Sequence, residues 1–214
     1  MHRRSFLAAT ASVPLAAGLA GCSALFDASR PDALEDVDAD PDQLPTPTRG
    51  DGDVTVAVYE DLGCPACHDF QADVMPELEA ELIEPDEIAY RHYDFVVGAA
   101  DESVAMANAA RAVQDETRDG DDPNGAFFAY KAAVMNADDW SDDGLAELAE
   151  LVDADPDAVT AALEDETYYP TLAADWERGE DAGVEATPTV VVDGEQIEDP
   201  FDTDEIFDAV EDAS

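Results

Sequence analysis

The sequence predicts an α/β domain into which a block of helices is inserted. Three observations indicate this fold class: a β-branched strand is followed directly by a helix, several helical stretches follow a second strand, and a tight hairpin precedes the last helix. Apolar residues make up 46% of the 214 residues, which is enough to fill one core. The length allows one domain with appendages, or at most two small domains.

The first strand is predicted over Val54–Tyr59, because its β-branched residues suit a buried strand. A short turn leads to Cys64, and Pro65 fits the first position of a helix, where no backbone N–H is needed. Apolar residues then recur at every fourth position on one helix face: Phe70, Val74, Leu78 and Leu82. A bend in this helix is expected at Pro76.

The rest of the domain is predicted as a strand, a helical region, a hairpin and a final helix. The second strand covers 88–95. Helices are predicted over 102–116, 125–136, 142–152, 156–166 and 171–183. Asp193 and Gly194 form a tight turn between strands at 190–192 and 195–197, and the last helix covers 204–211.

The charge of the chain is extreme, since 54 Asp and Glu stand against nine Lys and Arg and give a formal net charge of -45. This balance excludes nucleic acid as a natural partner, because binding to phosphates requires a basic surface. The acidic residues are spread along the whole chain, which predicts a protein that stays folded in molar salt and an extremely halophilic source. An acidic binding surface in an ordinary organism is the alternative.

Residues 1–21 have the pattern of an export signal. Arg3 and Arg4 precede an apolar stretch over 6–20 that is too short and too interrupted for a membrane span. The paired arginines resemble a twin-arginine signal, and Leu-Ala-Gly-Cys at 19–22 resembles a lipoprotein cleavage box, so Cys22 is expected to be lipidated. The alternative is an uncleaved N-terminal anchor. Either interpretation attaches the protein to the outer face of the cell membrane.

Residues 22–52 are predicted to form an acidic, proline-rich tether, because they contain no sustained apolar period. A flexible chain of about thirty residues has a root-mean-square reach of about 30 Å. The folded domain is therefore expected over 53–214, just off the membrane.

The spacing of the cysteines indicates redox chemistry. With Cys22 lipidated, one pair remains, Cys64 and Cys67, and this spacing is that of redox pairs and also of half a zinc site. A zinc site needs two further ligands, and beyond the export signal the only histidines are His68 and His92. A purely structural disulfide is the other alternative, although it would close a short loop and stabilise the fold little.

The position of Cys64 at the start of a predicted helix favours its thiolate. The helix macrodipole and the free N–H groups of the first turn lower the pKa of such a thiol. Cys64 is therefore expected to be the exposed, attacking sulfur. Cys67, about one turn further along, is expected to resolve the mixed disulfide.

Two motifs together resemble a known fold. Cys-Pro-Ala-Cys at 64–67 after a first strand, with Thr-Pro-Thr at 187–189 before a hairpin and a last helix, resembles the thioredoxin fold. The inserted helices make the chain similar to DsbA-like thiol-disulfide oxidoreductases of the membrane-associated extracytoplasmic branch, over about 54–212. The resemblance implies an α/β thioredoxin-like fold with an inserted helical subdomain at about 100–183, in which a cis Pro188 faces the redox pair.

The same resemblance implies an activity. Cys64 and Cys67 would catalyse dithiol-disulfide exchange in exported client proteins, and a quinone-linked membrane partner would reoxidise them. Pro188 and the Thr187 backbone would shape the groove that receives the client chain. The supporting positions of this active site are Pro65, Ala66 and His68. No cofactor and no metal are expected.

The sequence leaves two other functions open. One is an extracytoplasmic thiol reductase that serves haem or metal-site maturation, which the equilibrium with glutathione would distinguish from an oxidant. The other is a non-enzymatic carrier of copper or another metal that binds through Cys64, Cys67 and His68. Such a carrier would retain stoichiometric metal after dialysis.

The chain departs from the family at two points, and one of them is the dipeptide Pro65-Ala66, which lacks the histidine that helps several strong oxidants of the family to hold the thiolate. Many thioredoxin-fold proteins carry a buried acid six residues before the first cysteine, where this chain has Val58. Glu60 and Asp61 lie nearby, and the sequence leaves open whether they are buried. His68 is interpreted as a solvated residue of the first helical turn, and His92 as a structural residue in a strand.

The remaining aromatic and acidic clusters are interpreted as structural. Core packing is expected for Phe127, Phe128, Tyr130, Trp140 and Trp176. The acidic runs at 119–122 and 138–143 do not have the ligand spacing of an EF-hand loop, so they are expected to be solvated loops without a specific metal.

Overall fold

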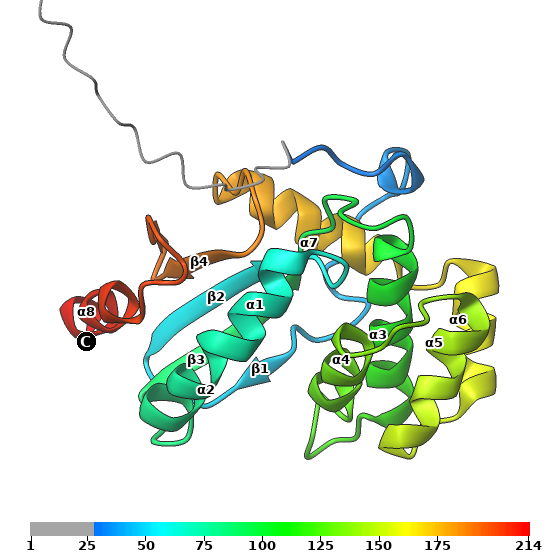
Figure 1. Ribbon diagram of the computed structural model, residues 1–214, viewed down its shortest axis with the longest axis horizontal. Helices are drawn as coiled ribbons and strands as arrows, with labels where there is room; N and C mark the ends of the chain where they lie inside the picture. Colours follow the sequence, from blue (N-terminus) through cyan, green and yellow to red (C-terminus); the bar gives the residue numbers. More distant parts are fainter. Residues whose placement is uncertain (1–27) are drawn as a thin grey trace, which may run out of the picture.

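The computed structural model describes residues 28–214 (Figure 1). The predicted export signal over 1–21 and the predicted lipidation at Cys22 lie outside the described residues. Within 28–214, none of the helices has both the length and the apolar character that a membrane span requires.

The centre of the domain is a five-stranded sheet with the order β1-β3-β2-β4-β5. The central strand β2 (Val54–Glu60) pairs in parallel with β3 (Ile88–Asp94) and antiparallel with β4 (Thr189–Val192). The outer strands are the short β1 (Thr48–Arg49) and β5 (Glu195–Gln196). The predicted strands are thus confirmed, with boundaries shifted by one residue.

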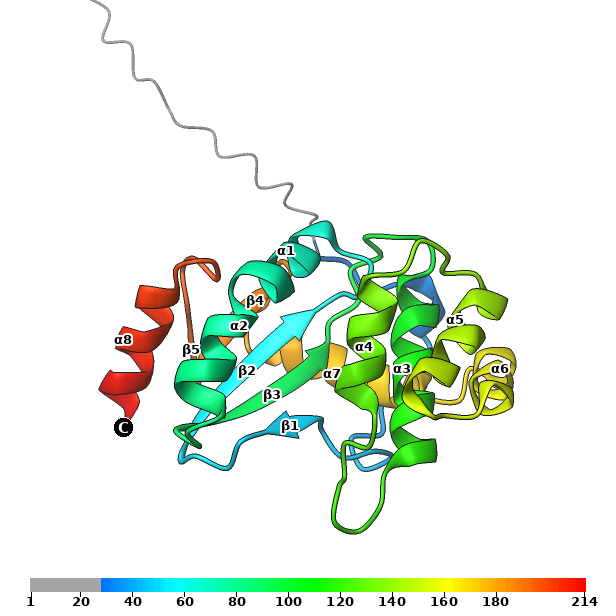
Figure 2. The ribbon, with the colours of Figure 1, turned by 60° about the horizontal axis from the view of Figure 1, so that its bottom comes forward.

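Helices cover both faces of the sheet (Figures 1 and 2). On one face, α1 (Pro65–Asp73), α2 (Met75–Leu78), the π-helical turn Glu79–Ile83 and α8 (Thr203–Ala213) bury the valines of β2 and β4. On the other face, α7 (Tyr169–Asp181) packs Trp176 flat against Phe95, with ring centroids 4.1 Å apart. The break between α1 and α2 agrees with the expected bend at Pro76, since proline disrupts the hydrogen bonding of the preceding turn.

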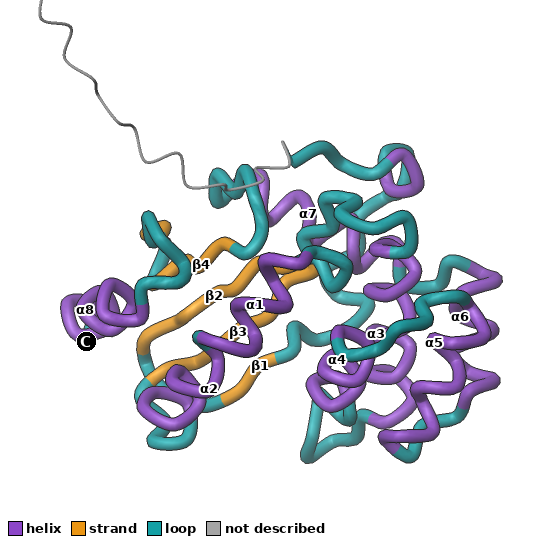
Figure 3. Tube along the Cα trace, viewed as in Figure 1, coloured by secondary structure: helices purple, strands orange, loops and turns teal. Residues whose placement is uncertain are grey.

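The predicted helical insertion is a bundle beside the sheet (Figure 3). It contains α3 (Ser103–Thr117), α4 (Phe127–Met135), α5 (Asp142–Ala149) with the 3-10 turn Glu150–Val152, and α6 (Pro156–Asp165). Side chains cap two of these helices as their sequences suggest: Ser141 accepts from the N–H of Gly144, and Asp155 from that of Asp157. All five predicted helices are therefore present, but the fifth, α7, covers the sheet instead of joining the bundle.

The expectation of a tether over 22–52 is wrong for its described part. Residues 28–47, called the strap below, lie against the domain before β1 begins. Leu34 is completely buried, Leu44 is 4% exposed, and the carbonyl of Pro47 accepts a hydrogen bond from the N–H of His92 at 3.0 Å. Two isolated leucines and scattered hydrogen bonds fix this segment, which is why it shows no apolar period.

Candidate active site

The loop before Cys64 is held by the buried side chain of Asp61. One carboxylate oxygen accepts from the N–H of Gly63 at 2.8 Å, and the other accepts from Val97 and Ala99 at 2.9 and 3.1 Å. The carbonyl of Asp61 also accepts from the N–H of Cys64 at 2.9 Å. Asp61 is therefore a buried residue that positions the first cysteine.

Cys64 lies at the N-cap of α1, and Pro65 occupies the first turn of the helix, as expected. The Cys64 thiol donates to the carbonyl oxygen of Thr187, 3.6 Å away. The hydrogen bond from the Cys67 side chain outweighs burial and, with the backbone N–H groups of Ala66 and Cys67, lowers the pKa of Cys64 to about 6. The Cys64 side chain is only 2% exposed, so the expectation of an exposed sulfur is wrong: the Thr187 loop covers it.

Cys67 lies one turn further along α1 and is completely buried. Burial, followed by its hydrogen bond to Cys64 and the charge of Glu60, raises the pKa of Cys67 well above the usual value of a thiol. Both cysteines are free thiols in this structure. The pair therefore combines one sulfur that ionises readily with one that keeps its proton.

The loop that faces the pair contains the Thr187–Pro188 peptide bond, which is cis. Pro188 is buried, and Thr187 is half-buried with its carbonyl directed at Cys64. The Thr189 hydroxyl donates to the Ala186 carbonyl at 2.8 Å and closes this turn. The structure thus brings residues 64 and 187–188 together, although 123 positions separate Cys64 from Thr187.

His68 is more constrained than the solvated residue expected from the sequence. Its Nε2 lies 2.6 Å from the carbonyl oxygen of Leu62, so this nitrogen carries the proton and donates it. Its ring also meets Trp140 edge-on, with centroids 6.2 Å apart. The contact with Leu62 ties the first turn of α1 to the loop before Cys64. Around the pair, Pro65 is exposed and Ala66 is half-buried.

Glu60, at the end of β2, is completely buried, a point that the sequence left open. It forms an ion pair with Lys131 of α4, and His92 Nδ1 lies 3.2 Å from the same carboxylate oxygen. Burial acts to raise the pKa of Glu60, but Lys131 and then His92 outweigh it and hold the value at about 2. Glu60 is therefore ionised, close enough to Cys67 for its charge to affect that thiol.

A series of buried ionic contacts leads from His92 to Asp175 of α7. His92 Nε2 lies 3.0 Å from Asp94, and Arg111 of α3 binds Asp94 at 2.7 Å and Asp175 at 2.6 Å. Burial opposes ionisation of Asp94, but Arg111 and His92 hold its pKa well below its usual range. Burial and the neighbouring Asp94 raise the pKa of Asp175 to about 6. His92 is thus a structural residue, as interpreted, within a buried ionic network.

Other interpreted residues are placed as follows. Phe127, Tyr130 and Trp176 are buried in the core as expected, whereas Phe128 and Trp140 are only partly buried. Across 28–214, the side chains of His, Cys, Asp and Glu form no group of three or more that could hold a metal ion.

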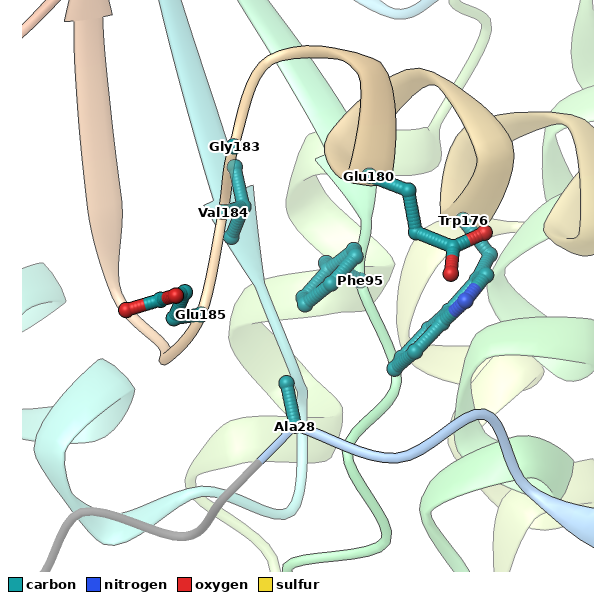
Figure 4. Close-up of a pocket in the computed structure, with 7 residues that line it drawn as sticks. All are labelled: Ala28, Phe95, Trp176, Glu180, Gly183, Val184 and Glu185. Atoms are coloured by element: carbon teal, nitrogen blue, oxygen red, sulfur yellow. The ribbon is translucent and has the colours of Figure 1, made fainter.

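A shallow pocket lies beside the Thr187 loop (Figure 4). The side chains of Phe95 and Trp176 form its wall, and its lining also includes Ala28 of the strap and the residues Glu180, Gly183, Val184 and Glu185. Neither cysteine lines it, so it is not the redox site.

Comparison with known proteins agrees with this geometry. The model of the thioredoxin family matches residues 46–212. The chain is 24% identical to disulfide bond formation protein D of Bacillus subtilis over 169 residues, which are 76% of this chain and 73% of that protein.

Solved structures show the same fold. The oxidised form of BdbD from Bacillus subtilis has a TM-score of 0.69 and 24% identity, covering 82% of this chain and 98% of that one. DsbA from Chlamydia trachomatis has a TM-score of 0.68 and 23% identity, covering 83% and 94%.

Proposed function

Because this chain belongs to the thioredoxin family and is a DsbA-like protein-disulfide oxidoreductase, we propose that Cys64 and Cys67 carry its activity, on exported proteins. The observation that supports this most is the difference between the two thiols. The pKa of Cys64 is lowered to about 6, while burial raises that of Cys67. A redox pair needs this difference, since one sulfur must attack and leave easily and the other must hold a proton.

Oxidation of a client proceeds in two exchanges. A client thiolate attacks Cys64 of the Cys64–Cys67 disulfide, so a mixed disulfide forms and Cys67 leaves and takes up a proton. A second client thiolate then attacks the client sulfur of the mixed disulfide and releases Cys64 as a thiolate. The client loses two electrons and two protons in forming its disulfide; the cysteine pair gains both electrons and one proton, on Cys67, and the other proton passes to water. Its low pKa makes Cys64 a good leaving group in the second exchange.

The loop at 187–188 receives the client backbone in this proposal. The contact of 3.6 Å between the Thr187 carbonyl and Cys64 supports this role, because a chain paired with the loop would pass next to the reacting sulfur. Pro188 shapes the loop, and Pro65, Ala66 and His68 form the start of α1 around the pair. His68 acts through its hydrogen bond to Leu62 and so is a positioning residue.

The site of action proposed is the outer face of the cell membrane, with Cys22 lipidated. This part rests on the sequence of residues 1–22 alone. The electrons collected by the pair must pass to another oxidant before a second turnover, and a quinone-linked membrane protein is the proposed partner. Both features fit an enzyme that acts on proteins after export.

Two serine variants test the assigned roles. Cys64→Ser is expected to abolish exchange with a reduced client protein. Cys67→Ser keeps the reactive sulfur, so it is expected to accumulate a mixed disulfide with an oxidised client, visible on a gel without reductant and lost with it. Identical behaviour of the two variants would exclude the roles given to these residues.

The equilibrium with glutathione separates an oxidant from a reductase. A lowered pKa of Cys64 stabilises the reduced pair and so favours transfer of the disulfide to clients. Because this pKa of about 6 lies between those of thioredoxin, about 7, and DsbA, about 3.5, we expect a potential between about -270 and -120 mV. A value below this range would favour the reductase.

A further inference from the structure

We infer that the face carrying Cys64 is held toward the membrane, so that the pair acts on thiols close to the bilayer surface in preference to thiols of released proteins. The inference rests on the proposed function and on the proposed lipid at Cys22. It names the class of client as chains that are still held at the membrane.

Ala28 lies near the redox site. The N–H of Ala28 donates to the carbonyl of Glu185 at 3.3 Å, and Glu185 is two residues from Thr187. The Thr187 carbonyl lies 3.6 Å from the Cys64 sulfur. Two residues span at most about 7 Å, so Ala28 lies within about 15 Å of that sulfur. Figure 4 shows Ala28 and Glu185 among the residues that line the pocket beside this loop.

Contacts with the domain hold the strap in place, so that residues after Ala28 do not lengthen the connection to the membrane. Arg30 donates to the carbonyl of Val37 at 3.3 Å and lies 3.7 Å from Glu177 of α7. Leu34 is completely buried against Val96 and its neighbours. The distance that the domain can move from its attachment is therefore set by the residues before Ala28, and not by the whole segment up to Gly52.

Few residues remain between the attachment and the domain. Cys22 and Ala28 are six positions apart, which corresponds to about 20 Å when fully extended. The Cys64 sulfur then stays within about 35 Å of the lipidated residue. A compact domain of this size measures about 40 Å across, so attachment at the opposite end would raise this upper limit to about 60 Å. The end of the molecule that carries Cys64 is the end nearest the membrane.

The consequence is a limit on substrates. A thiol pair near the bilayer, in a membrane protein or in a chain emerging from an export channel, lies within the range of Cys64. A thiol pair held about 60 Å above the bilayer lies outside it. If all of residues 22–52 formed a flexible tether, Cys64 would reach thiols at both distances from the bilayer.

The experiment uses the full chain, purified from the membrane of producing cells and reconstituted on vesicles in molar KCl. The vesicles carry the pre-oxidised protein together with a synthetic dithiol peptide that is attached to a lipid. The attachment is either direct or through a 40-residue helical spacer of about 60 Å. A soluble form of the peptide reports the exchange activity itself. One variant has twenty Gly and Ser residues inserted between Asp27 and Ala28. The matched control has the same insertion after Gly120, in an exposed loop.

The protein and the Gly120 control are expected to oxidise the direct peptide at least tenfold faster than the spaced one. The insertion before Ala28 is expected to reduce this ratio to within threefold without changing the rate on the soluble peptide. Equal rates on the two lipid-linked peptides, or a chain that does not float with vesicles, would overturn the inference. No exchange with the soluble peptide would instead overturn the proposed function, and the inference with it.

Discussion

Lys131 of the helical bundle and Glu60 at the end of β2 form a buried ion pair next to the redox cysteines. Lys131 is the only lysine in the sequence and is 3% exposed, while Glu60 is completely buried. In a chain with 54 acidic residues, this cation is placed where a carboxylate has no access to water. The pair thereby joins the bundle to the strand that leads into the active site.

Replacement of Lys131 by methionine should destabilise the protein strongly. It leaves Glu60 as a buried charge with only His92 and Gln71 as partners, and breaking a buried pair in this way costs about 3–5 kcal/mol. Denaturant unfolding in molar KCl measures the loss.

The double variant Lys131→Met with Glu60→Gln serves as control and should recover most of that stability, because the charge is removed with its partner. If Lys131→Met alone unfolds at the denaturant concentration of the unchanged protein, the ion pair does not stabilise the fold.

The alkylation rate of the reduced protein should follow the ionisation of Cys64. Its pKa of about 6 means that the thiolate predominates at pH 7 and is lost as the pH falls through 6. Iodoacetamide labelling followed by peptide mass analysis should give a midpoint near pH 6 for Cys64 and much slower labelling of Cys67, whose pKa burial raises. Faster labelling of Cys67 than of Cys64 would reverse the assigned order of the two sulfurs.

The fold should depend on salt. A formal net charge of -45 repels itself strongly at low ionic strength, whereas the screening length falls from about 10 Å at 0.1 M to about 3 Å at 1 M salt. Circular dichroism is expected to show cooperative melting in molar KCl and loss of structure near 0.1 M. The same melting curve in both conditions would contradict the prediction of a halophilic source.

The strap should contribute to stability in the way that a core element does. Leu34→Ala removes a completely buried side chain and is expected to cost about 2–5 kcal/mol. Leu151→Ala, at a leucine that is 71% exposed, is the matched control and should stay within about 0.5 kcal/mol of the unchanged protein. Equal, small effects of both changes would mean that residues 28–47 do not stabilise the domain.

Regular elements and the redox motif could be predicted because their information is local. The β-branched run at 54–59 and the helical periods within 102–183 indicate their structures within a few residues. The contact between Cys64 and the loop at 187–188 could be expected only because the two motifs together resemble the thioredoxin fold. No local pattern connects positions so far apart in the sequence.

Contacts between distant single residues could not be predicted in this way. Glu60 and Lys131 are separated by 71 positions, and no spacing rule pairs them. A signal was present, however, because the sole lysine lies in a helix that is otherwise apolar, Phe127–Met135. Such a lysine indicates a buried anion elsewhere. The strap left a weaker signal, since Leu34 and Leu44 are isolated apolar residues in an acidic segment.

The inserted bundle supplies the cations that neutralise two buried carboxylates of the central sheet. Glu60 and Asp94 end the two parallel central strands, and their partners Lys131 and Arg111 come from α4 and α3. A shortened chain that joined β3 directly to β4 would retain Cys64 and Cys67 but lose both cations, so that the two anions Glu60 and Asp94 would keep only His92 as a partner in these ion pairs. Each broken pair costs about 3–5 kcal/mol against a total stability of about 5–15 kcal/mol. We therefore expect that the thioredoxin core of this protein does not fold without the bundle, and that bundle and sheet unfold in a single cooperative transition.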